Sequence, residues 1–394
     1  MGFRHESAAA WWSLLPWPLL LACATASPAP TSPEAAPDRQ YPVEAFGAAL
    51  RATVAAEAPT TFTASPRPEL SIPIGAKKPV TCQLHRGTLS LSQYLRGVAT
   101  LLERYTVTAR AASVETQGAR LVLSVELGYA GASGLLGILR ATVATGSAGS
   151  LACSLVDAET DGRHGAAYSQ AMSTLLKSAT DFSEQPARFT EVWRGAGAWA
   201  GRLAMVRTLR DAPGPSVQGQ LVSLLARVEG GRLVFVETRQ AFEADASGEI
   251  LRGSIETRTE DARGDLLTVL ERRGPREYAM SVQAQGSDPT PVLTQTSAPL
   301  THFLAQAQRL GEAAARPDSA PVRFVEWGGL APPDQGFVVR EREARRTGPR
   351  TMVLTSREEV ERCDLAEPGS CARVEQRQAH QPLVLYRAAV FGRP

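Results

Sequence analysis

Residues 249–260 alternate strictly between two series of side chains, and this pattern constrains the fold more than any other feature of the chain. Successive side chains of a β-strand point to opposite faces of the sheet, so one series is expected to face the core and the other water. Parallel sheets are covered on both faces, and a strand with one wet face therefore indicates an antiparallel sheet covered on one side. The dry series is Leu251, Gly253, Ile255, Thr257 and Thr259, and the wet series is Arg252, Ser254, Glu256, Arg258 and Glu260.

The surrounding sequence predicts an antiparallel meander from residue 189 to residue 285, because turn residues recur between its apolar runs. The turn signals are Gly230-Gly231, Ser247-Gly248, Arg263-Gly264 and Gly274-Pro275. Further strands are expected over 121–129, 135–145, 151–157, 322–327, 337–345, 351–355 and 383–391.

Apolar residues at helical spacing predict four helices. The first covers 43–57, and the second begins at Ser90, whose side chain can form a capping box with Gln93. The third includes Tyr168 and ends near Thr180, and the fourth spans 299–315 and is expected to cover the dry face of the meander. The expected fold class is α+β, with curved antiparallel β-sheets covered by a few amphipathic helices.

Composition changes along the chain divide it into five segments. We expect a signal peptide over 1–22, a lipidated cysteine with a proline-rich tether over 23–40, an N-terminal α+β domain over 41–185, a β-meander domain with its covering helix over 186–316, and a C-terminal β extension or small domain over 317–394.

Two of these segments contain similar sequence. Residues 118–145 align without gaps to residues 230–257 and are identical at nine of 28 positions. Two related β-rich units would explain this similarity, and two meanders drawn from the same restricted set of residues would explain it as well.

The N-terminus has the pattern of an export signal. Ala8–Ala22 is an uncharged run of 15 residues, which suits the apolar region of a signal peptide and is shorter than the ~20 residues that cross a bilayer. The run ends in Leu20-Leu21-Ala22-Cys23, which resembles a bacterial lipobox. The resemblance implies that the Cys23 thiol is lipidated and that cleavage before Cys23 exposes an amine that is then acylated.

A lipid anchor of this kind has consequences for location. Several acyl chains hold a protein firmly, whereas a single chain binds a membrane only marginally. Ala24 follows the cysteine in place of Asp, and in the lipoprotein pattern this implies the outer membrane of a diderm bacterium. The segment 24–40 is rich in proline and lacks large apolar residues, so it is expected to be an extended tether. The alternative is cleavage after Ala24-Thr25-Ala26, which would release a soluble secreted or periplasmic protein.

The remaining cysteines predict disulfides. Removing Cys23 from the five leaves an even number, which in an exported chain indicates paired thiols. We expect the pairs Cys82–Cys153 and Cys363–Cys371, each within one proposed domain. Four buried thiols are the alternative, and a zinc site is poorly supported because Cys82 and His85 have no second local pair.

No catalytic motif indicates an enzyme. The chain lacks a nucleophile elbow, a zinc-protease helix, a phosphate loop and a dinucleotide fingerprint. We expect no cofactor and no metal, and the net charge of +2 gives no field that would attract nucleic acid. A hydrolytic site built from distant residues, including one of the histidines 85, 164, 302 or 380, is an alternative.

Two stretches are candidates for contact with a ligand or partner. On one strand, Trp193, Gly195, Gly197 and Trp199 would share a face and form a notch between two indoles. The alternative is that the two rings cover bare sheet at the glycines. Residues 340–346 form a run of mixed charge that suits either a binding edge or a solvated edge strand protected from aggregation.

These features predict a cell-envelope lipoprotein with a non-catalytic binding or scaffolding role. It contacts the membrane through its acyl chains and an envelope protein through its folded body. The alternatives are a carrier of an apolar ligand in a half-barrel-like cavity, and an envelope hydrolase.

Overall fold

The computed structural model describes residues 39–392 apart from short gaps, of which the longest are 181–188, 210–215 and 328–338. Three sheets dominate the described chain, and nearly all of their strand pairs are antiparallel. The protein is therefore β-rich, as the alternating patterns predict. Within the described residues, no helix is long and apolar enough to cross a membrane.

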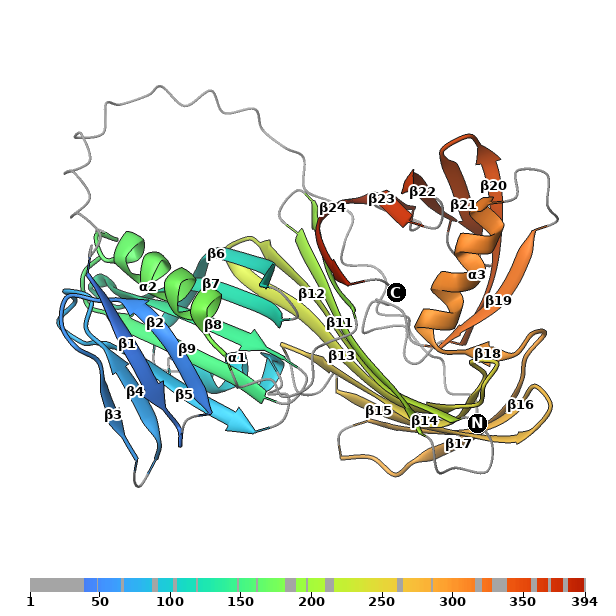
Figure 1. Ribbon diagram of the computed structural model, residues 1–394, viewed down its shortest axis with the longest axis horizontal. Helices are drawn as coiled ribbons and strands as arrows, with labels where there is room; N and C mark the ends of the chain where they lie inside the picture. Colours follow the sequence, from blue (N-terminus) through green and yellow to red (C-terminus); the bar gives the residue numbers. More distant parts are fainter. Residues whose placement is uncertain are drawn as a thin grey trace, which may run out of the picture. The chain divides into compact units, whose positions relative to one another are not determined.

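The first large sheet has seven strands and follows the N-terminal half of the chain (Figure 1). Its order is β3 (Thr61–Thr63), β4 (Glu69–Ile72), β5 (Val80–Arg86), β9 (Gly149–Asp157), β8 (Gly134–Thr145), β7 (Arg120–Gly131) and β6 (Thr106–Gln117). The three strands predicted in this region correspond to β7, β8 and β9.

The helix predicted over 43–57 is wrong. These residues form a hairpin of β1 (Gln40–Ala45) and β2 (Leu50–Ala55). Phe46 and Gly47 have φ angles of 58° and 67°, and such left-handed backbone reverses the chain rather than continuing a helix. The apolar residues that mimic helical spacing belong to two strands that face the same core.

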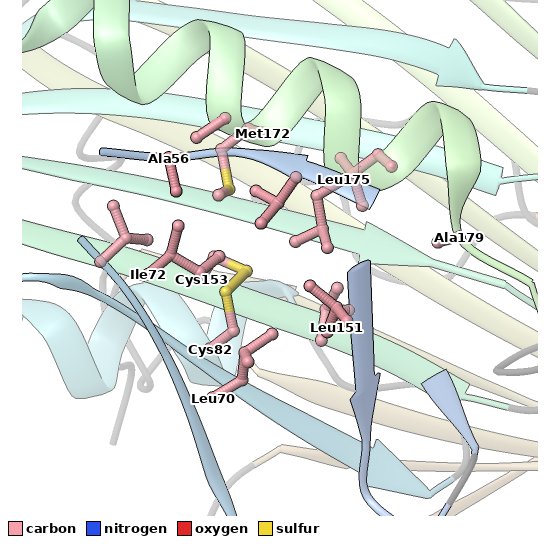
Figure 2. Packing of buried hydrophobic residues seen from close by; sticks show 14 of the residues in the cluster. Ala56, Leu70, Ile72, Cys82, Leu151, Cys153, Met172, Leu175 and Ala179 are labelled. Atoms are coloured by element: carbon pink, nitrogen blue, oxygen red, sulfur yellow. A yellow bond between two sulfur atoms is a disulfide. The ribbon is translucent and has the colours of Figure 1, made fainter. Parts of the chain in front are cut away.

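The predicted helix that ends near Thr180 is present as α2 (Gly165–Ser178), which covers one face of the seven-stranded sheet. Its buried side chains, including Tyr168 and Leu175, pack with β1, β2 and the sheet into one apolar core. Figure 2 shows Met172 and Leu175 pointing from the helix toward the sheet. Arg120 at the start of β7 donates to the Leu176 and Ala179 carbonyls at 3.0 and 2.6 Å. This arginine satisfies backbone acceptors at the helix C-terminus.

A disulfide joins Cys82 and Cys153 in the middle of this core (Figure 2). The two residues are direct partners on β5 and β9, and both are buried. The predicted pair is therefore present.

The opposite face of the seven-stranded sheet packs against the second large sheet. Side chains from both sheets form one cluster that includes Leu123, Leu139, Leu224 and Phe235. Because β8 is covered on both faces, nine successive residues of its C-terminal part are buried.

The helix α1 (Leu91–Leu101) connects the two large sheets through polar contacts. The backbone N–H and the hydroxyl of Ser92 both donate to Glu237 Oε2, at 2.8 and 2.7 Å. Arg96 donates to Asp265 Oδ2 at 2.7 Å. A carboxylate from the second sheet thus satisfies the first turn of a helix that lies between β5 and β6 of the seven-stranded sheet.

The second large sheet has 15 strands, which are all the described strands after residue 188. Its order is β17 (Thr290–Gln295), β16 (Glu277–Ala284), β15 (Leu266–Gly274), β14 (Ile250–Thr259), β13 (Arg232–Ala244), β12 (Ser216–Glu229), β11 (Ala198–Leu209), β10 (Phe189–Gly195), β24 (Pro382–Gly392), β23 (Ser370–Arg377), β22 (Val360–Glu367), β21 (Thr351–Thr355), β20 (Val339–Gly348), β19 (Val322–Trp327) and β18 (Leu300–Thr301). The predicted meander is present as β10 to β16.

The helix α3 (Phe303–Ala315) packs mainly on β19 and β20 (Figure 1), and its first residue, Phe303, packs against Leu221 of the meander. The prediction that the whole helix covers the meander is therefore wrong. The reason lies in its connections, because β18 and β19 pair in parallel and α3 links them. Parallel neighbours need a crossover, and a crossover helix covers the strands that it joins. Arg346 of β20 donates to the Ala314 carbonyl at 2.7 Å and so satisfies the end of this helix.

Aromatic rings fill the places where glycines thin the second sheet. Phe242 is the direct partner of both Gly219 and Gly253. A methyl group added at Gly219 would lie 2.2 Å from the Phe242 ring, and one added at Gly253 would lie 2.6 Å from the Trp327 indole. Rings that cover glycines in this way stabilise a curved sheet.

The two similar sequence stretches each form a pair of consecutive antiparallel strands, β7 with β8 and β13 with β14, and each pair follows a tight turn. Arg120 begins β7 and Arg232 begins β13, and each is the first residue paired across a turn, to Gln117 and Glu229 respectively. The hairpins then differ, because β7 and β8 meet at Gly131 and Gly134 whereas a longer turn separates Ala244 from Ile250.

Candidate functional site

The structure contradicts the single strand predicted over 193–199. β10 ends at Gly195 and β11 begins at Ala198, and the two strands form an antiparallel hairpin. Trp193 is opposite Ala200, and Trp199 is opposite Arg194, so the two tryptophans lie on neighbouring strands. Gly197 lies outside the described residues, and a contact role for these four positions stays a prediction.

The charged run 340–346 belongs to an internal strand and not to an edge strand. β20 pairs with β19 on one side and with β21 on the other. Several of its charges have structural partners, since Glu343 accepts from Arg323 at 3.1 Å and Arg346 donates to three backbone carbonyls. Both predicted explanations of this run assumed an edge and are wrong on that point.

The other predicted cysteines are described in part. Cys363 is buried and disulfide-bonded. The side chain of Cys371, its predicted partner, is outside the described side chains, and Cys23 lies outside the described residues.

The site that sequence reasoning missed is an exposed apolar cluster at one end of the seven-stranded sheet. Three exposed side chains, Tyr105, Leu136 and Val156, and the buried Tyr129 make up this group, which we call the tyrosine cluster. Tyr105 is 40% exposed, Leu136 39% and Val156 38%. Large apolar side chains that gather on a surface mark contact sites more often than isolated ones do.

The ring of Tyr129 packs beside the ring of Tyr105 and extends across β8. It lies 5.5 Å from the Tyr105 ring, measured between centroids. It also crosses Gly137 of β8, because a methyl group there would lie 2.2 Å from Tyr129 Oη and 2.4 Å from the Asp157 carbonyl oxygen. The ring therefore extends from β7 across Gly137 toward the end of β9, the strand that carries Val156.

A register shift brings Leu136 to the same place. Tyr129 pairs with Gly137 and Ala130 pairs with Leu135, which leaves Leu136 as an extra residue on β8. Such bulges redirect side chains near functional surfaces. A methyl group added at Gly131 would lie 3.1 Å from Leu136 Cδ1, which places this leucine beside the β7 end of the cluster.

A buried charged network supports the sheet behind the tyrosine cluster. Arg140 of β8 donates to Glu126 at 3.0 Å and to Asp157 at 3.3 Å. The Arg140 and Asp157 side chains are 5% and 2% exposed. Asp157 also accepts from the backbone N–H of Glu159 at 3.0 Å. A buried carboxylate needs several such donors, so these contacts fix the end of β9.

His164 extends this network to the start of α2. Its Nδ1 lies 3.0 Å from Asp157 Oδ2, and a carboxylate can only accept, so Nδ1 donates. His164 occupies the N-cap position of α2, and the Asp157 charge thus lies near the positive end of the helix. Burial raises the pKa of Tyr129, and the negative charge of Asp157 raises it further, so the phenol stays neutral at ordinary pH.

A hydrolytic triad needs a hydroxyl beside the histidine. Among the described contacts, the His164 ring bonds to Asp157 and to no hydroxyl. His85 lies on β5 and His302 stacks on Phe242 with ring centroids 4.9 Å apart, while His380 is outside the described residues. In the part of the chain that is described, no group of three metal-binding side chains is gathered.

Several buried side chains contact one another near the start of α3. The His302 ring stacks on Phe242, and Gln240 donates to the Trp327 carbonyl at 3.2 Å. Tyr278 donates to Glu249 at 2.7 Å and accepts from the Leu300 N–H at 3.1 Å. Burial and the Glu249 contact both raise the Tyr278 pKa, which keeps this buried hydroxyl a donor.

One sequence signal for the site was available. Arg140 and Asp157 are the only charged residues of β8 and β9, and Glu126 is the only charged residue of β7 after Arg120 at its start. Charges in largely apolar strands are buried only when they are paired.

Comparison with models of protein families, with curated proteins and with solved structures gives no match for this chain.

Proposed function

We propose that this chain is an exported, lipid-anchored cell-envelope protein that binds a partner without catalysis. Cys23 carries the acyl chains, the segment 24–40 sets the distance from the membrane, and the folded body makes the contact. In this proposal the anchor lies in the outer membrane of a diderm bacterium.

The observation that carries the proposal is the Cys82–Cys153 disulfide. Both cysteines are almost fully buried beneath α2 and are direct cross-strand partners. Disulfides persist in oxidising compartments and are rare in the cytosol. The pair supports export independently of the lipobox-like sequence at Leu20–Cys23.

The tyrosine cluster is the contact face in this proposal. It offers the exposed ring of Tyr105, which packs on the buried ring of Tyr129, and two exposed aliphatic side chains at one sheet end. Aromatic residues are enriched at the centres of protein interfaces. The network around Arg140 keeps the β7, β8 and β9 ends in one arrangement, and a preorganised surface loses less entropy when it binds.

The experiment that tests the proposal is an intact mass of the mature protein from the membrane fraction, with and without reductant. We expect an N-terminus at Cys23 with added acyl mass and a gain of about two mass units for each disulfide reduced. A soluble species that begins at Ser27, or a full-length chain that retains Met1, contradicts the lipid anchor.

A matched pair of variants locates the anchor. Cys23→Ala is expected to move the protein from the membrane fraction to the soluble fraction, because the acylation site is lost. Ser27→Ala changes the residue after the alternative cleavage site and should leave the protein in the membrane. Equal membrane association of the two variants contradicts the role of Cys23.

A further inference from the structure

The ends of the two large sheets differ in how they are protected against strand pairing. β3 has three residues and β18 has two, and short edge strands offer little backbone to a partner. β6 is long, but it packs on the second sheet, and its Ala109 N–H donates to the Gly231 carbonyl at 2.6 Å. Within the described strands, β17 is the remaining end of a large sheet.

β17 lacks the charges that usually protect an edge strand, and Pro291 removes only one backbone donor from it. It reads Thr-Pro-Val-Leu-Thr-Gln and holds no charged side chain. Leu293 is 68% exposed, the highest value among the large apolar side chains that are described, and Val292 is 41% exposed. Natural edge strands usually carry charges that prevent pairing, so an uncharged, apolar edge indicates a contact site.

The backbone of β17 shows which residues face the open side. Thr296 donates its N–H to the Arg276 carbonyl at 2.9 Å, so even-numbered residues bond inward to β16. Pro291 has no N–H, and it occupies an odd-numbered position where none is needed for β16. Residues 291, 293 and 295 therefore present their backbone groups outward. Leu293 and Gln295 offer both a donor and an acceptor, whereas Pro291 offers an acceptor alone.

We propose that β17 pairs antiparallel with β17 of a second copy of this chain, centred on Leu293. In this register each Leu293 exchanges both backbone hydrogen bonds with its symmetry mate. Each Gln295 N–H then donates to the opposite Pro291 carbonyl, which is the one group that Pro291 can supply. A closed two-fold interface of this kind places the same patch of both copies in contact.

The chemistry of β17 favours a second copy over a strand of a different protein. Like charges directly opposite each other destabilise paired strands, and β17 has none to oppose. The proline also selects the register, because centring the pair on Pro291 would leave neither copy with a donor there. Leu293 against Leu293 and Val292 against Thr294 are compatible cross-strand pairs. The proposal stands apart from the lipid anchor and the tyrosine cluster.

Cross-linking through a single introduced cysteine tests the register. Leu293→Cys is expected to give a disulfide-linked dimer on a non-reducing gel after mild oxidation of cells that produce the full chain. Leu267→Cys is the matched control, because Leu267 is 39% exposed on β15, two strands in from the edge. The parent chain is a second control, because any disulfide-linked dimer that it forms must involve its natural cysteines. Equal cross-linking at 267 and 293, or none at 293, overturns the proposal.

The mass of the full chain in a mild detergent, measured by light scattering, tests the association itself. The parent is expected to be dimeric at high concentration, and Leu293→Lys is expected to be monomeric because two ammonium groups would face each other. Leu267→Lys should remain dimeric, and circular dichroism should show all three chains folded. A monomeric parent, or a Leu293→Lys variant that remains dimeric, overturns the proposal.

Discussion

At the scale of single residues, a few buried charges determine how the seven-stranded sheet ends. Arg140 connects Glu126 of β7 to Asp157 of β9, and Asp157 in turn holds His164 at the start of α2. Desolvation makes each of these groups costly alone, so the network is stable only when it is complete. The tyrosine cluster depends on this end of the sheet for its shape.

Asp157→Asn is expected to lower the free energy of unfolding by about 3 kcal/mol, because it removes the charge opposite the buried Arg140 guanidinium. Urea denaturation measures the change. Glu115→Gln is the control, since Glu115 and Arg194 form an ion pair at 3.2 Å in which both side chains are about half exposed. That control should change stability by less than about 1 kcal/mol. Equal changes in the free energy of unfolding for the two substitutions would show that the buried network stabilises the fold no more than an exposed ion pair does.

Gly137→Ala is expected to destabilise the fold by about 1–3 kcal/mol, because the methyl group would overlap Tyr129 and the Asp157 carbonyl. Thermal unfolding measures this change. Gly97→Ala on α1 meets no atom within 4 Å and should stabilise its helix by up to about 1 kcal/mol. If both substitutions raise the unfolding temperature, or both lower it, the close contact of Tyr129 with Gly137 does not explain the result for Gly137→Ala.

At the scale of elements, the strands were easier to predict than the packing of the helices. The strands 322–327 and 351–355 were predicted with the bounds of β19 and β21, because alternation and turn residues are local signals. β22 and β23 were missed because their many charges hide any alternation. The partner of α3 was misassigned because the parallel pairing of β18 and β19 is not visible in local sequence.

The candidate site shows the same limit. Asp157 and His164 are close in sequence, and their contact could be expected from a turn before a helix. The approach of Tyr129 to Asp157 depends on a bare glycine on a different strand and on a bulge at Leu136. These features arise from strand pairing, which sequence patterns do not specify.

The attachment of α1 gives an element-scale prediction. Arg96→Ala and Asp265→Ala are each expected to destabilise the fold by about 1–2 kcal/mol, because the pair is partly buried and bridges α1 to the second sheet. The double variant should lose less than the sum of the single variants, since both remove the same interaction. A double-mutant cycle in urea measures this coupling, and additive losses contradict it.

At the scale of the whole molecule, the Cys82–Cys153 disulfide closes a loop with a sequence separation of 71 residues. Replacing both cysteines by alanine is expected to cost up to about 4 kcal/mol of stability, chiefly because the unfolded chain regains freedom. Chemical denaturation with and without reductant measures this cost. Reductant should shift the denaturation midpoint of the double variant less than that of the parent, because the variant retains the disulfide at Cys363 but not the Cys82–Cys153 bond. A parent whose denaturation midpoint is unchanged by reductant contradicts the prediction.

The pairing of β10 with β24 has a consequence for how the chain is made. β10 begins the second sheet in chain order and β24 ends it, yet the two are direct neighbours. A ribosome completes the partner of β10 only after it has produced every other strand of that sheet. Contacts so distant in sequence form slowly, and until residues 382–392 arrive one side of β10 remains open to wrong partners. We therefore expect chaperones to shield the open edge of β10, or the chain to be transported unfolded, until β24 has been made.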